Sequence, residues 1–158
     1  MDISTTCCFT GHRKISAEKM KKIVVTLDRV IETLISGGVT DFISGGAIGF
    51  DLLAASLIVS KKESGKKIRL IFALPCKNQD ALWTPEQQTQ YQNLLKEADE
   101  IVYISEKYNS TCMKKRNYYM VEQSEHCVCA LVHEKSGTGQ TVRYARDRGL
   151  KIVNVIID

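Results

Sequence analysis

The sequence has no apolar run close to the roughly 20 residues that a membrane-spanning helix needs, so we expect no membrane partner. Residues 1–6 carry neither a basic region nor a long apolar stretch, which argues against a secretory signal. The six cysteines include no Cys-x-x-Cys pair, so we interpret them as structural thiols and expect no metal site. Together these absences predict a cytoplasmic protein.

Two nucleotide-binding signatures are also missing. The chain has no strict Gly-x-Gly-x-x-Gly fingerprint and no Walker A lysine-serine pair, which argues against an ordinary NAD dehydrogenase or a P-loop NTPase. The net charge of +4 is mild: it permits an anionic ligand, but we do not expect nucleic acid as a partner. A length of 158 residues and 44% hydrophobic residues predict a single globular domain over residues 1–158.

Short apolar segments alternate with amphipathic ones along the whole chain. Strands are predicted at about 5–10, 40–44, 68–74, 101–104, 126–132 and 152–156. Helices are predicted between them, after Ser16, over 50–62, after Thr84, over 112–123 and over 141–148. This order predicts an α/β fold: a Rossmann-like, doubly wound, mostly parallel sheet of about six strands with helices on both faces.

Three of the predicted strands end in glycine-rich turns that open helices. These turns are 10–13, 44–49 and 136–141. The first amides of a helix have no partner within the helix, and they point at one spot near the positive end of its dipole. Because the carboxyl ends of parallel strands share one edge of the sheet, the three turns predict one pocket for a phosphate-bearing, nucleotide-like ligand.

Several side chains in these turns suit such a ligand. Thr10 offers a hydroxyl, Arg13 offers a planar fork for phosphate, and His12 offers a donor or an acid–base group. Asp51 falls in a first helical turn, where it stabilises the dipole or accepts from ribose hydroxyls. The alternative is that these are plain strand-to-helix loops with exposed charges.

The segment 112–123 holds a polar interruption. Met113, Asn117 and Met120 share one helical face, and Arg116 lies on the adjacent face. One interpretation is a core hydrogen bond beside a surface arginine, and the other is an arginine–asparagine pair facing the ligand.

Two further pairs leave alternatives open. His133 and Glu134 are either an acid–base pair or an exposed loop, and Trp83 and Tyr108 either stack on a base or serve the core or an interface.

Five segments together resemble the SLOG superfamily, named for the SMF/DprA and LOG proteins, and in particular its YpsA-like branch. They are 9–13, 45–51, 74–76 with Gln79 and Trp83, 112–121 and 137–141. The resemblance implies a Rossmannoid fold that binds a nucleotide-derived ligand such as those made from NAD or ADP-ribose. We assign no catalytic residue and no cofactor, and we expect homo-oligomers. The predicted ligand-binding residues are Thr10, Gly11, His12, Arg13, Ser44, Gly45, Gly46, Ala47, Asp51, Leu74, Arg116, Asn117, Gly137, Thr138 and Gly139.

The leading hypothesis is therefore a protein that senses or sequesters a nucleotide-derived, cyclic or linear signal, rather than an enzyme. The first alternative is a LOG-type phosphoribohydrolase or an NAD-type glycohydrolase. Arg116 matches the arginine of the LOG motif, but Thr141 stands where that motif has a glutamate. The second alternative is a protein-interaction adaptor in cell-division or stress control.

Overall fold

All six predicted strands lie in one sheet. The computed structural model describes residues 1–156, in which the strands follow the order β4-β3-β2-β1-β5-β6 and every neighbouring pair is parallel. The strands are β1 (Thr6–Gly11), β2 (Asp41–Ser44), β3 (Arg69–Cys76), β4 (Glu100–Ser105), β5 (His126–Ala130) and β6 (Lys151–Asn154). The predicted α/β, Rossmann-like fold is confirmed.

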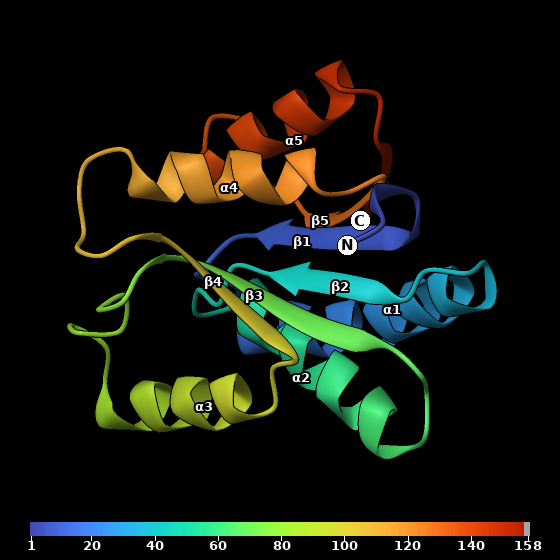
Figure 1. The fold of residues 1–158 in the computed structure, drawn as a ribbon, viewed down its shortest axis with the longest axis horizontal. Helices are drawn as coiled ribbons and strands as arrows, with labels where there is room; N and C mark the ends of the chain where they lie inside the picture. The colour runs from blue at the N-terminus through green and yellow to red at the C-terminus, as the bar shows by residue number, and fades with distance from the viewer. Residues whose placement is uncertain (157–158) are drawn as a thin grey trace.

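The helices form a layer on each face of the sheet. They are α1 (Ala17–Ser36), α2 (Phe50–Glu63), α3 (Pro85–Lys96), α4 (Cys112–Glu122) and α5 (Gly137–Asp147), and the turn η1 (Ile3–Thr5) precedes β1. In Figure 1, α1, α2 and α3 lie below the sheet, and α4 and α5 lie above it. The two faces bury separate apolar clusters, one against each helical layer.

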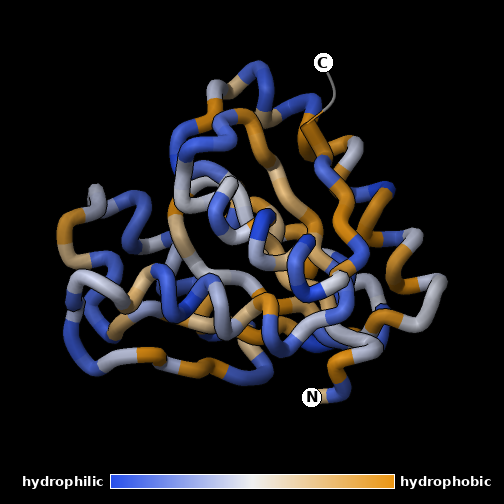
Figure 2. Tube along the Cα trace, turned by 90° about the horizontal axis from the view of Figure 1, so that it is seen from above, coloured by the Kyte–Doolittle hydropathy of each residue, from blue (hydrophilic) through white to orange (hydrophobic). Residues whose placement is uncertain are grey.

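The helices follow from the spacing of their apolar residues. Ile23, Leu27 and Ile31 recur every four residues and form the buried face of α1. The helix α2 is buried along most of its length, because it packs on β1, β2 and β3 and also contacts α1 and α3. Figure 2 shows that hydrophobic and hydrophilic stretches alternate along the chain.

The strand order creates a switch point beside β1. From β1 the chain adds β2, β3 and β4 on one side, and α4 then crosses the opposite face so that β5 pairs with the other side of β1. Ligands of open parallel sheets bind at such a point, outside the carboxyl ends of the strands. The turns after β1, β2 and β5 all lie at this end, as the sequence predicts.

Two element bounds differ from prediction for identifiable reasons. The strand β3 does not stop before Pro75 but continues to Cys76; its pairing with β2 ends at Phe72, so the missing proline N–H breaks no bond on that side. The helix α5 begins at Gly137 rather than near 141, because Ser136 caps it by accepting from the Gly139 amide at 3.0 Å. The third glycine turn is therefore the first turn of a helix.

Two glycines of this turn give a matched test of its packing. A Cβ at Gly139 would lie 2.0 Å from the Glu134 carbonyl oxygen, whereas a Cβ at Gly137 would have no neighbour within 4 Å. We expect Gly139→Ala to lower the free energy of unfolding by about 2 kcal/mol or more. Gly137→Ala should leave it unchanged or raise it by up to about 1 kcal/mol, since alanine favours helix. Urea denaturation of both variants checks this, and equal effects would contradict it.

Candidate functional site

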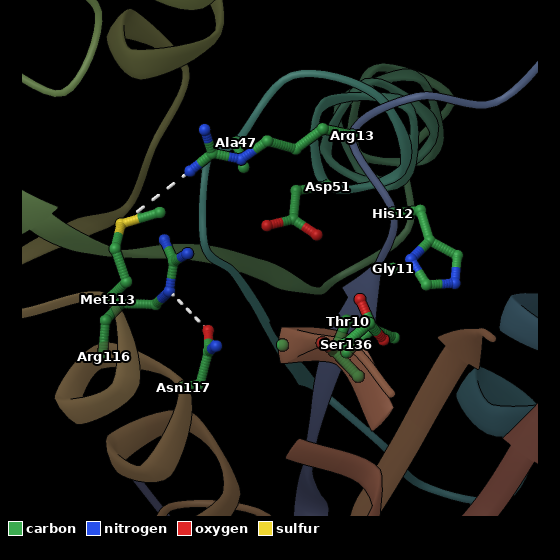
Figure 3. A pocket seen from close by; sticks show the side chains of 12 residues that line it. Thr10, Gly11, His12, Arg13, Ala47, Asp51, Met113, Arg116, Asn117 and Ser136 are labelled. Carbon is green, nitrogen blue, oxygen red and sulfur yellow. Dashed lines mark hydrogen bonds between the residues drawn. The ribbon is translucent and has the colours of Figure 1, made fainter. Parts of the chain in front are cut away.

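A cavity of about 260 Å³ opens at the carboxyl ends of β1 and β5. It brings together the turn after β1, the turn before α2, one face of α4 and the first turn of α5 (Figure 3). Ten of the predicted residues line it: Thr10, Gly11, His12, Arg13, Ala47, Asp51, Arg116, Asn117, Gly137 and Thr138. We call this space the polar cavity, and its existence fulfils the expectation that distant turns converge.

Five other predicted residues do not line the polar cavity. Ser44, Gly45, Gly46, Leu74 and Gly139 stand in its supporting wall. The Ser44 hydroxyl donates to the Asp51 carbonyl at 2.9 Å and accepts from the Gly46 amide at 3.2 Å, so it holds the turn together. Leu74 is fully buried in the apolar core. The structure thus does not bring these five residues to the surface of the polar cavity.

Arg116 is not a surface residue: its exposed fraction is 3%. Its Nη1 donates to the Gly45 carbonyl, and its Nε donates to the Asn117 side-chain oxygen at 2.8 Å. A Cβ at Gly45 would lie 2.6 Å from that Nη1, so a side chain there would move the guanidinium from this position. Burial, together with repulsion from Arg13, lowers the pKa of Arg116. The surface position that the first interpretation gave to Arg116 is therefore wrong, whereas the ligand-facing role of Arg116 and Asn117, which both line the polar cavity, stays a prediction.

Asp51 points into the middle of the polar cavity (Figure 3). It is 4% exposed, and its Oδ1 has no hydrogen-bond partner among residues 1–156. Burial raises the pKa of this carboxyl to about 6, although the charge of Arg116, a backbone hydrogen bond from Ala47 and the charge of Arg13 act in the opposite direction. Within the described residues neither arginine approaches Asp51 closely enough to form an ion pair. An acceptor buried without a donor is costly, which suits a group that binds something from outside the chain.

The donors face Asp51 from several directions. Arg13 reaches over the cavity, and its Nη2 contacts the Met113 sulfur at 3.8 Å, a weak acceptor that leaves the guanidinium available. The amides of Gly137 and Thr138 belong to the first turn of α5, where no carbonyl within the helix accepts from them. Two guanidiniums and a helix N-terminus outweigh one carboxylate, so the polar cavity suits an anion.

His12 lines the cavity but has a second task. Its Nε2 accepts from the backbone amides of Val132 and His133 at 2.9 and 3.2 Å, which ties the turn after β1 to the turn after β5. Burial, and then the neighbouring His133, lower the pKa of His12, in accord with a neutral ring that accepts. His133 and Glu134 are both exposed, as the loop interpretation expects.

Two lining residues were not predicted. Met113 contacts Arg13, and Ser136 caps α5. The signal for Ser136 was present, because serine before a glycine-rich helix start is a favoured N-cap. Met113 carries no such signal, since a methionine on an apolar helical stripe indicates a core position.

Comparison with known proteins gives the family. The model for the YspA SLOG family, named YpsA, matches residues 7–149. The chain belongs to this family. It is 34% identical over 140 residues to the uncharacterized SPbeta prophage-derived protein YoqJ of Bacillus subtilis, covering 80% of this chain and 82% of that protein. It is 26% identical over 130 residues to the UPF0398 protein BH1768 of Halalkalibacterium halodurans, covering 81% and 66% of the two chains.

Solved structures of the same SLOG fold include DNA processing protein A (DprA). The DprA of Streptococcus pneumoniae matches with a TM-score of 0.68 and 14% identity, over 94% of this chain and 49% of that one. TM1055 matches with a TM-score of 0.59 and 16% identity, over 94% and 72%. The chain thus spans about half of the pneumococcal DprA, and at these identities the likeness is one of fold.

Residues 1–156 contain neither a membrane-spanning helix nor a cluster of metal ligands. None of their helices is long and apolar enough to cross a bilayer. No three histidine, cysteine or acidic side chains in this range gather as a metal site would require.

The state of Asp51 predicts a gain in stability when its charge is removed. Its pKa is higher in the folded than in the unfolded protein, so its favourable contribution is complete below about pH 4 and is lost as the pH rises through about 6. At pH 7.5 we expect Asp51→Asn to raise the free energy of unfolding by about 2 kcal/mol. Urea denaturation from pH 4.5 to 7.5 should show the difference shrinking toward low pH. A less stable variant at pH 7.5 would point instead to a stabilising ion pair.

Proposed function

We propose that this SLOG protein binds a nucleotide-derived small molecule, as a sensor or a store of that molecule. The observation that carries the proposal is the Oδ1 of the buried Asp51 carboxylate, which has no partner within residues 1–156 and lies among the cations of the polar cavity. A ligand with both an anionic group and hydroxyl donors pairs with the arginines through its anionic group and with Asp51 through a hydroxyl.

The anionic part of such a ligand matches the α5 side of the cavity. The amides of Gly137 and Thr138 lie in the first turn of α5, and Ser136 and Thr138 add hydroxyls to the same wall. Helix N-termini of this kind bind phosphate. Arg13 and Arg116 supply the opposing charge, and a guanidinium pairs with phosphate through two parallel hydrogen bonds.

The sugar part matches Asp51. Its unpartnered Oδ1 needs a donor, and a ribose hydroxyl is one. A carboxylate beside a phosphate site is also how many dinucleotide-binding folds hold ribose. A plain inorganic anion would leave that oxygen without a donor, so we favour a ribose phosphate over phosphate alone.

Binding should depend on the two arginines and on the carboxylate. By titration calorimetry at pH 7.5, with AMP, ADP-ribose and NAD as probes, we expect at least one to bind. The Kd should rise at least tenfold in Arg13→Ala and in Asp51→Asn, because each change removes a charge-assisted or otherwise unpaired contact. Arg29→Ala on the exposed surface of α1 is the matched control and should leave the Kd unchanged. No binding at millimolar concentration would refute the proposal.

The proposed ligand is a small molecule and not a nucleic acid. A DprA structure from Helicobacter pylori is described as showing a single-stranded DNA binding mode, and it matches this chain with a TM-score of 0.67 at 19% identity. We still propose a small molecule, because the chain's net charge is only +4 and the polar cavity is small.

We also propose that the protein forms homo-oligomers. Analytical ultracentrifugation of the purified protein tests this by measuring its molecular mass in solution.

Hydrolysis of an N-glycosidic bond is the second candidate function, and the pKa of Asp51 favours it. A carboxyl that titrates near pH 6 is suited to acid–base work. Against it, Asp51 is the only carboxylate among residues 1–156 that lines the polar cavity, whereas glycoside hydrolysis commonly uses two. Thr141 has no carboxylate to supply. Its buried hydroxyl also has a structural partner, because it donates to the Gly137 carbonyl at 2.8 Å.

Base release separates the two functions. We expect no free adenine or nicotinamide from AMP or NAD by chromatography after prolonged incubation, because the described lining holds no second carboxylate and the Nε2 of His12 is engaged by two backbone amides. Release that disappears in Asp51→Asn while persisting in Arg29→Ala would establish the hydrolase instead.

A further inference from the structure

A second cavity, of about 660 Å³, adjoins the polar cavity. Arg13 and Met113 line both, so the contact between them forms the partition. The remaining walls include Gln79, Leu82, Trp83 and Tyr108 and are more apolar than those of the polar cavity. We call this space the aromatic cavity. Its continuity with the polar cavity places it within reach of any ligand whose sugar and phosphate lie beside Asp51.

The aromatic wall is held rigidly in place. The Trp83 ring packs edge-on against the buried Tyr91 ring, with 5.0 Å between centroids. The turn that carries Trp83 is tied to α3, because Gln88 and Gln92 donate to the backbone and carboxylate of Asp80 at 2.8 and 3.2 Å. Stacking on a ring that is already fixed costs little conformational entropy.

Gln79 presents an acceptor without a donor. Its Nε2 donates to the Gly45 carbonyl at 3.5 Å and to the Tyr91 hydroxyl at 3.3 Å. Because a carbonyl can only accept, this contact fixes which end of the amide faces Gly45. The opposite end, Oε1, is buried and has no partner in the described chain. It calls for a donor such as an amino group.

Two large side chains of the same cavity face solvent. Leu82 is 99% exposed and Tyr108 is 66% exposed, and both line the aromatic cavity. The Arg13–Met113 partition is a weak N–H···S contact, so a ligand can displace it at little cost, and the planar guanidinium is able to stack on an aromatic ring.

We propose that the aromatic cavity is the base subsite of the ligand, and that it takes an amino-bearing planar base such as adenine. The inference rests on the proposed function, with ribose and phosphate in the polar cavity. The base stacks between Trp83 and Tyr108 and donates its amino group to Gln79. A base with a carbonyl at that position leaves Gln79 without a donor and is selected against.

Trp83 is the only tryptophan in the chain, so its fluorescence reports on this cavity directly. We would titrate the protein with AMP, IMP and ribose 5-phosphate and follow emission excited at about 295 nm together with calorimetry. AMP should quench Trp83 and bind at least tenfold more tightly than ribose 5-phosphate, since a stacked base adds that much or more. IMP should bind at least fivefold more weakly than AMP.

Two variants test the contacts. Tyr108→Ala changes an exposed side chain and should weaken AMP binding at least threefold while leaving ribose 5-phosphate binding unchanged. Gln79→Leu should remove the preference for AMP over IMP. Tyr103→Ala is the matched control, because Tyr103 is a half-exposed tyrosine on β4 that does not line the aromatic cavity, and its AMP affinity should equal that of the wild type.

These experiments distinguish a failure of the base subsite from a failure of the proposed function. Ribose 5-phosphate binding that is lost in Asp51→Asn, with no gain for AMP and no quenching, overturns the base subsite and leaves the proposed function standing. Absence of binding by all three probes overturns both.

Discussion

The hydrogen bond from the Arg116 guanidinium to the Gly45 carbonyl joins the two helical layers over the end of the sheet. Arg116 comes from α4 on one face, and Gly45 precedes α2 on the other. The bond depends on the absence of a side chain at position 45, since a side chain there would move the guanidinium. It also fixes the cation beside Asp51, so the charge balance of the polar cavity depends on it. The same carbonyl accepts from Gln79, which links the polar cavity to the aromatic cavity.

The polar cavity is held together by the packing of the apolar core around it and not by its own charged groups. Asp51 and Arg116 are both buried, yet within the described residues they form no direct ion pair, and the protein bears the desolvation of both groups. The surrounding apolar clusters, packed on both faces of a parallel sheet, supply the compensating stability. A binding site that holds a carboxylate and a guanidinium near each other without an ion pair is organised before its ligand arrives, and the free protein is less stable for it.

The fold could be predicted from the sequence because its signals are local. The four-residue spacing of Ile23, Leu27 and Ile31, and the Thr84 capping box, each predict an element without knowledge of the rest. The convergence of the turns also follows, since parallel strands direct their ends to one edge. The roles of Ser44 and Leu74 could not be predicted, because whether a residue lines a cavity or supports its wall depends on three-dimensional packing. The burial of Arg116 depends on the approach of a distant glycine, which helical periodicity does not report.

The polar cavity draws on both ends of the chain. Thr10 to Arg13 belong to the first strand and its turn, whereas Ser136 to Thr138 open the last helix. The His12 ring holds these two segments together through the amides after β5. During synthesis on the ribosome the cavity is therefore incomplete until the first turn of α5 has emerged. A fragment shortened at either end, by an early stop codon or by proteolysis within these segments, lacks part of the wall even when the remaining strands still pair.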